Sequence, residues 1–145
     1  MSQSRIYRRS MLIAIVSAGV LLMASPSCAA VETSVSVDPG ASFTLAPGQT
    51  AAVKGVDARI TFKQVREDSR CPVDVTCVWE GDAKIDIVVS RNGVPDDTRI
   101  LSITKSNEVR VGNLRIRFVS LAPVPRQADA NVPRKYVAEF VVDQV

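Results

Sequence analysis

EDSRCPVDVTCVWEGDAKID, residues 67–86, separates two runs in which apolar and polar residues alternate. This segment holds two of the three cysteines, the only tryptophan and six of the fifteen acidic residues of the chain. Gly81 lies where its irregular part meets a strand-like run that begins at Ala83. The segment therefore predicts a loop between two β-strands, and this loop concentrates the chemistry that the flanking runs lack.

Alternation with a period of two residues continues in both directions from this loop and is typical of half-buried β-strands. Turn residues such as Asn92-Gly93 separate the successive runs. No stretch after residue 30 has a helical period, and none is repeated. Strands are expected at residues 31–37, 42–45, 58–63, 83–89, 98–104, 108–111, 114–121 and 136–142. In the strand at 98–104, Ile100 and either Leu101 or Ile103 are expected to face inward. In the strand at 136–142, Tyr136 is expected on the same face as Phe140.

About seven to eight strands in a single domain, residues 31–145, predict an all-β fold, either an antiparallel β-sandwich or a small barrel. A domain of this length buries enough apolar surface to fold without further staples. Residues 122–133 contain three prolines and no periodicity, so we expect a surface loop there. The sequence also allows a helix near residues 127–131 within that loop.

Residues 1–30 have the pattern of an export signal peptide. A basic head with three arginines precedes an uncharged apolar run, residues 11–24, and small residues follow it. This run of 14 residues is shorter than the ~20 that a transmembrane helix needs. We therefore expect a cleaved signal rather than a permanent membrane span.

Two routes of cleavage stay open at the end of this signal. The small residues 27–30 suit an ordinary signal peptidase, whereas Cys28 is also placed to become the lipid-bearing first residue of a bacterial lipoprotein. Ser25 and Pro26 depart from the usual lipoprotein pattern. A lipid on Cys28 is the only link to a membrane that the sequence suggests. The expected location is the periplasm, the outer membrane as a lipoprotein, or the outside of the cell.

The formal charge of +3 belongs to the signal segment rather than to the domain. No acidic residue precedes Glu32, and the three basic residues before it are all arginines of the signal. The remaining 15 basic residues balance the 15 acidic ones, so residues 31–145 are neutral. A neutral domain gives no reason to expect nucleic acid as a partner.

Cys71 and Cys77 are the two cysteines that remain after the signal, and an oxidising compartment would pair them. Their spacing differs from that of thioredoxin-like redox sites. Because the chain has no histidine, two thiols cannot complete a zinc site of the usual kinds. We expect a structural disulfide that contributes ~2 kcal/mol and shapes one loop.

The lack of histidine also excludes Ser-His-Asp and Cys-His catalysis, and no glycine-rich phosphate loop is present. Carboxylates of the central loop leave a carboxylate-based enzyme and a calcium site as alternatives, with Glu80, Asp82 and Asp86 as candidate ligands of calcium. Basic residues interleave with these acids, which favours solvated charge with local ion pairing. We therefore expect no enzyme activity and no cofactor.

Trp79 lies two residues after Cys77, and two interpretations of its indole compete. In the simpler one, it packs over the disulfide as a small satellite core. In the other, it is an exposed anchor for a partner, on a loop that the disulfide and a proline stiffen. The loop also has the general form of a protease-inhibitor loop. The candidate contact residues are Pro72, Val73, Asp74, Val75 and Trp79.

Residues 68–83, DSRCPVDVTCVWEGDA, resemble a signature of the form DSRCPxxVxCVWxGxA found in small exported proteins and lipoproteins of bacteria. Cys, Pro, Trp and Gly match it at each fixed offset over 16 of the 145 residues. The resemblance implies a location in the bacterial envelope and a β domain. It transfers no catalytic residue, because these proteins have no established activity.

Together these features predict a non-enzymatic exported module of the cell envelope. Its unknown partner is expected to be an envelope or extracellular protein that contacts residues 71–77 and the neighbouring acids. Protease inhibition by the same loop is one alternative. A calcium-stabilised structural surface protein or a carboxylate-based enzyme is the other.

Overall fold

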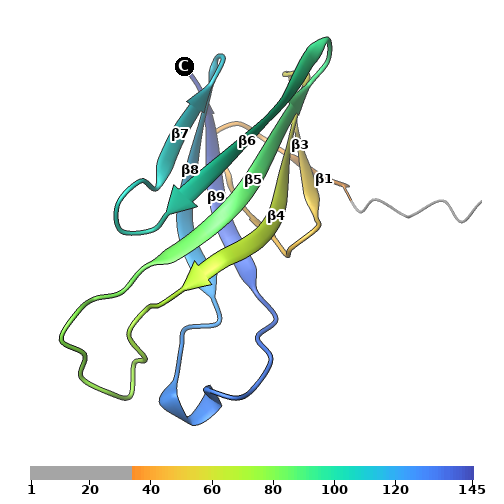
Figure 1. Ribbon diagram of the computed structural model, residues 1–145. Coiled ribbons are helices and arrows are strands. Elements are labelled where there is room, and N and C mark those ends of the chain that lie inside the picture. Colours follow the sequence, from red (N-terminus) through yellow and green to blue (C-terminus); the bar gives the residue numbers. More distant parts are fainter. Residues whose placement is uncertain (1–33) are drawn as a thin grey trace, which may run out of the picture. The chain divides into compact units, whose positions relative to one another are not determined.

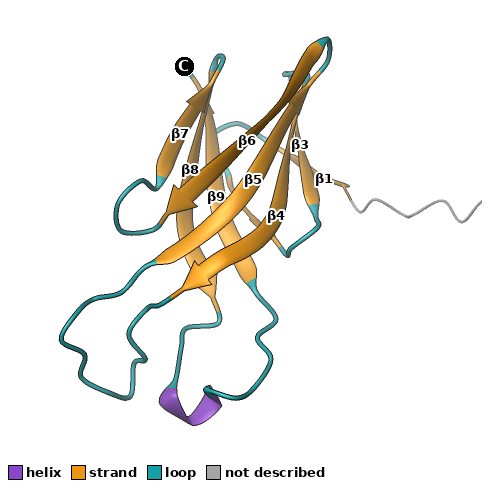
Figure 2. Ribbon diagram, in the orientation of Figure 1, coloured by secondary structure: helices purple, strands orange, loops and turns teal. Residues whose placement is uncertain are grey.

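Nine β-strands form most of residues 34–145, the part of the chain that the computed structural model describes (Figures 1 and 2). The expected signal, residues 1–30, and Cys28 lie outside the described residues. The strands are β1 (Ser34–Val37), β2 (Ser42–Leu45), β3 (Thr50–Val53), β4 (Ala58–Asp68), β5 (Ala83–Arg91), β6 (Val94–Ser102), β7 (Glu108–Val111), β8 (Leu114–Ala122) and β9 (Val137–Gln144).

The strands form two sheets, one of five strands in the order β1-β3-β4-β5-β6 and one of four in the order β2-β9-β8-β7. The paired strands run antiparallel, except that β1 pairs with β3 in parallel. Each sheet has two free edges, so the fold is a β-sandwich and not a closed barrel. The predicted all-β class is confirmed, and of the two expected architectures, β-sandwich and small barrel, the structure has the sandwich.

The core lies between the two sheets, where the alternating apolar residues of both meet. Phe140 of β9 is at its centre, with ring centroids 5.8 Å from Phe43, 6.0 Å from Phe62 and 5.9 Å from Phe118. These separations are those of favourable aromatic pairs. Phe62 belongs to the five-stranded sheet and Phe140 to the four-stranded sheet, so the pair joins the two layers.

Two features of the strands differ from the sequence prediction. Strand β3, with its short sequence Thr-Ala-Ala-Val, was not expected, because alanine gives little strand signal. In β6 Ile100 is 52% exposed and Leu101 is buried, which corrects the expectation that Ile100 faces inward. Leu101 pairs with Ile85 of β5, and residues opposite each other in a sheet share one face.

The long loops at one end of the sandwich are the disulfide loop, residues 69–82 between β4 and β5, and the proline loop, residues 123–136 between β8 and β9. Figure 1 shows them at the same end of the molecule, and the Val73 N–H donates to the Pro125 carbonyl oxygen at 3.0 Å. The surface loop predicted at 122–133 is confirmed, except that Ala122 is the last residue of β8. The helix that the sequence allowed in this loop is present as the short 3-10 helix η1 (Gln127–Asp129).

Candidate functional site

Cys71 and Cys77 form a disulfide within the disulfide loop, as predicted. Their Cα atoms are 5.9 Å apart, inside the usual range for bridged cysteines. Disulfides persist in oxidising compartments, so this bond indicates a non-cytoplasmic environment. Within residues 34–145, no helix has the length and apolar character needed to cross a bilayer.

The base of the disulfide loop is a narrow neck in which the two chain segments touch through their backbones. Ser69 N–H donates to the Asp82 carbonyl oxygen at 2.8 Å, and Cys71 N–H donates to the Glu80 carbonyl oxygen at 3.2 Å. Gly81 has a φ of +74° in this neck, and a Cβ atom there would overlap the Ser69 carbonyl oxygen. Both its backbone angle and the lack of space therefore require glycine.

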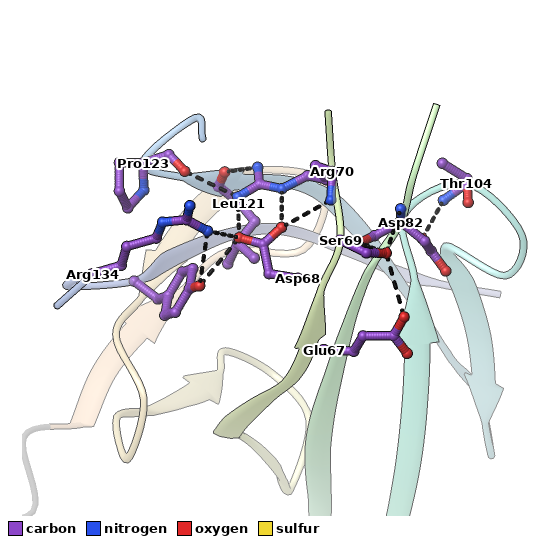
Figure 3. Close-up of polar contacts among 10 residues, drawn as sticks. Glu67, Asp68, Ser69, Arg70, Asp82, Thr104, Leu121, Pro123 and Arg134 are labelled. Atoms are coloured by element: carbon purple, nitrogen blue, oxygen red, sulfur yellow. Dashed lines mark hydrogen bonds and ion pairs between the residues drawn. The ribbon is translucent and has the colours of Figure 1, made fainter. Parts of the chain in front are cut away.

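Asp68, the last residue of β4, is the centre of a polar cluster that Figure 3 shows in close-up. Its side chain is only 4% exposed. It accepts hydrogen bonds from Arg70 at 2.7 and 2.9 Å, from Arg134 at 3.0 Å and from the Tyr136 hydroxyl at 3.1 Å. Burial raises the pKa of Asp68, but the hydrogen bonds and charge of Arg70, aided by Tyr136, outweigh it and hold this pKa below its usual value.

The same cluster fastens the disulfide loop to the proline loop. Arg70 donates to the backbone carbonyl oxygens of Leu121 and Pro123 in addition to its bonds with Asp68 (Figure 3). Arg134 lies at the far end of the proline loop and joins the same carboxylate. The guanidinium of Arg70 thus joins the end of β4 to the chain where β8 leads into the proline loop, which suits its planar set of donors.

A second tie lies nearer the tip of the two loops. The Asp74 carboxylate accepts the backbone N–H of Gln127, the first residue of η1, at 2.8 Å. This hydrogen bond lowers the pKa of Asp74. Together with the Val73–Pro125 backbone bond, it holds the bridged part of the disulfide loop against the proline loop.

Asp82 is buried at the base of the disulfide loop rather than solvated, which corrects the sequence prediction. Its carboxylate accepts the Ser102 hydroxyl at 2.7 Å and the Thr104 backbone N–H at 3.3 Å. Burial raises the pKa of Asp82, and these hydrogen bonds more than offset the rise, so the pKa lies below its usual value. Asp82 therefore connects the disulfide loop to the turn after β6.

Asp86 is also buried, although it lies on the outer face of β5, because the side chains of Gln64 and Arg66 cover it. Gln64 donates to it at 2.7 Å, and Arg66 forms an ion pair with it at 2.8 Å. The third candidate calcium ligand, Glu80, is exposed. In the described part of the chain no three His, Cys, Asp or Glu side chains lie together as a metal site would require, so these acids are not brought together.

Trp79 is 81% exposed and Val78 is 88% exposed, so the interpretation that the indole packs over the disulfide is wrong. A short loop with no second layer above it cannot cover a side chain that buries ~150–250 Å² in a core. The other interpretation, an exposed aromatic side chain on a stiffened loop, agrees with the geometry. Val73 and Val75 of the same loop are also exposed.

The two loops carry six of the twelve large apolar side chains that are exposed in the described chain, although they hold only about a quarter of its residues. We call these six the apolar surface. Clustering of exposed apolar residues is typical of interaction sites, whereas scattered ones are normal on any protein. The apolar surface consists of Val73, Val75, Val78, Trp79, Val124 and Val132.

Two open hollows flank Val124. The larger, of about 410 Å³, lies within the proline loop and is called here the proline-loop hollow. The smaller, of about 320 Å³, lies between the two loops and includes Cys71 and Glu80 in its lining. Both volumes are in the range of ligand sites.

Sequence reasoning singled out the disulfide loop but missed its partner residues on the proline loop. No sequence pattern marks Arg134, and Tyr136 was expected only as the first residue of the strand at residues 136–142. Both are more than 60 residues from Asp68, and no local pattern marks a pair so distant in sequence. The Asp68–Arg70 pair, two residues apart, was the one detectable signal.

Comparison of the chain with models of protein families, with curated proteins and with solved structures yields no match. The resemblance of residues 68–83 to a signature of exported proteins therefore stays a prediction. Fold and site together define a β-sandwich domain whose two long loops are fastened to each other at one end.

Replacing Cys71 and Cys77 together by serine is expected to lower the free energy of unfolding by about 2 kcal/mol and to leave the sandwich folded. The bridge closes a small loop, and the Asp68 cluster and the Val73–Pro125 bond hold the same loop independently. Urea unfolding of the variant measures this change, with chemically reduced wild-type protein as the control. A loss of the folded state in the variant would show that the sandwich depends on the disulfide, contrary to this expectation.

Proposed function

We propose that this protein is an exported, non-enzymatic binding module of the cell envelope, which contacts a partner protein through the apolar surface. The observation that carries the proposal is the exposure of Trp79 and Val78 on a loop fastened at several points. Tryptophan is enriched among the residues that dominate binding energies. A loop that is already ordered loses less conformational entropy when it binds.

The location rests on two independent features. The Cys71–Cys77 disulfide belongs to an oxidising compartment. Residues 1–30 have the composition of a signal peptide, and Cys28 offers a site for lipid. The partner is therefore sought in the envelope or outside the cell, in agreement with the resemblance of residues 68–83.

The state of the carboxylates argues against the enzyme alternative. Asp68, Asp82 and Asp86 each accept hydrogen bonds from protein groups, and the pKa of each lies below its usual value. A general acid or base works best with a pKa near the operating pH. These three carboxylates are thus ionised and already hydrogen-bonded to protein groups, which suits a structural role.

The protease-inhibitor alternative uses the same loop in a different way. An inhibitor loop presents its backbone to the protease, but the backbone N–H of Val73 is already donated to Pro125. We therefore place binding energy in the side chains of the apolar surface. Recovery of a protease in the experiment below would still identify inhibition as the outcome of that binding.

Replacing Val78 and Trp79 by serine is expected to weaken partner binding at least about 30-fold, because residues that anchor an interface contribute about 2 kcal/mol or more. The free energy of unfolding should change by less than about 0.5 kcal/mol, since both side chains are exposed. The measurement is capture of the partner from envelope extract and culture fluid by residues 31–145 in oxidised form, followed by titration.

The matched control replaces Val94 and Ile100 by serine, because both are exposed on β6 and belong to neither loop. This control is expected to bind like the wild type. Equal capture by the Val78/Trp79 variant and the wild type would remove the apolar surface from the proposal.

A further inference from the structure

The proline-loop hollow has positively charged walls. Among the residues that line it, three are basic and one is acidic. The basic ones are Arg126, Arg134 and Lys135, and the acidic one is Asp129. The rest of the lining is mainly proline, valine and alanine with the aliphatic stems of the basic side chains, so the hollow combines positive charge with apolar walls.

Two of these three basic side chains form no ion pair within the described part of the chain. No ion pair of residues 34–145 includes Arg126 or Lys135. Arg134 differs, because it forms an ion pair with Asp68 at 3.0 Å. The nearby Asp74 is held by the backbone of η1. Within residues 34–145 the lining therefore has an excess of positive charge over its one acidic residue, although the charge of Asp74 interacts with that of Arg126.

We infer that the proline-loop hollow binds a carboxylate of the partner, on a peptide segment in which an acidic residue stands beside an apolar one. Arginine and lysine suit carboxylates as ligands, and arginine adds directed hydrogen bonds. The hollow's volume of about 410 Å³ admits a side chain with its neighbours. This inference rests on the proposed function and specifies the chemistry of the partner.

Continuity with the apolar surface gives the second reason. Val124 and Val132 line the hollow and also belong to the apolar surface. One extended segment can therefore place an apolar side chain against these two valines while its carboxylate reaches Arg126. Exposed charges of this kind contribute mainly to selectivity and to the association rate.

Binding of defined peptides tests this directly. The probes are fluorescently labelled six-residue peptides of alternating leucine and aspartate, with counterparts that carry asparagine or lysine in place of aspartate. Fluorescence anisotropy with residues 31–145 should give at least about tenfold tighter binding of the aspartate peptide than of the lysine peptide. The preference should vanish at ~1 M salt, where the screening length falls to about 3 Å.

Charge reversal provides the critical variant. Arg126→Glu with Lys135→Glu is expected to invert the preference, so that the lysine peptide binds more tightly than the aspartate peptide. Both positions are exposed, so folding is preserved and is checked by thermal melting. The control is Arg59→Glu with Arg110→Glu, which makes the same change of charge at exposed positions on β4 and β7 and should leave the preference unchanged.

Equal binding of the aspartate and lysine peptides, or binding of neither, would overturn the inference, as would an unchanged preference after reversal at Arg126 and Lys135. The proposed function fails separately, when the partner is captured equally well after Val78 and Trp79 are replaced. If replacing Trp79 weakens partner capture and the charge reversal at Arg126 and Lys135 does not, the proposed function holds and the inference of an acidic peptide is wrong.

Discussion

Gly81→Ala is expected to lower the free energy of unfolding by about 3 kcal/mol. A left-handed backbone costs alanine about 1 kcal/mol, and overlap with a well-packed neighbour adds about 2 more. The neighbour here is the Ser69 carbonyl, which belongs to the backbone of the neck and cannot swing aside like a side chain. Urea unfolding measures the loss, and a change in the fluorescence of Trp79 reports displacement of the disulfide loop.

Gly93→Ala is the matched control, because Gly93 has a similar φ of +72° with no atom near the position of a Cβ. It should cost only the backbone term, about 1 kcal/mol. Equal losses in the two variants would show that the neck has room for a methyl group, contrary to the close approach of Gly81 and Ser69.

Asp68→Asn is expected to cost about 3 kcal/mol, the usual loss when one partner of a buried ion pair is removed. The asparagine keeps the shape of the side chain but leaves Arg70 and Arg134 without their shared carboxylate. Both loops should loosen together, because this carboxylate lies where they are joined. Hydrogen exchange of the backbone amides of Val73 and Gln127 would report that loosening.

The same carboxylate makes stability depend on pH. The pKa of Asp68 is lower in the folded state than its ordinary value of about 4. Its contribution is therefore fully present above that ordinary value and is lost as the pH falls through the folded-state pKa. The Asp68→Asn variant should lose this part of the acid sensitivity. Asp38→Asn, which breaks an exposed ion pair with Lys54, should change stability by less than about 1 kcal/mol and keep the acid sensitivity.

The sequence predicts this sandwich well where the period of two residues is strong. Ile85 and Ile87 of β5 and Ile116 and Phe118 of β8 are buried as their alternation indicates. The pattern fails in β3, where the residues are too small to mark a face, and at Ile100, where two apolar residues compete for one inward position. Pairing across the sheet decides such cases, and a single strand does not contain that information.

The sequence likewise predicts some features of the candidate site and misses others. The Cys71–Cys77 bridge follows from counting cysteines, because only one pairing remains after the signal. The burial of Asp68 does not follow, because it depends on residues from the other end of the chain. Trp79 illustrates the remaining difficulty: its exposure depends on what lies above the disulfide, and that is a property of the folded surface alone.

The edges of the two sheets limit how the molecule can aggregate. β1, β2 and β7 are edge strands of four residues each, and the longer edge strand β6 carries Pro95, Asp96, Asp97 and Arg99. Proline removes a backbone donor, and charged side chains oppose the addition of a foreign strand. Among residues 34–145, fibril growth therefore finds no long uncharged edge strand. We therefore expect copies at high local concentration not to join edge to edge through these four strands.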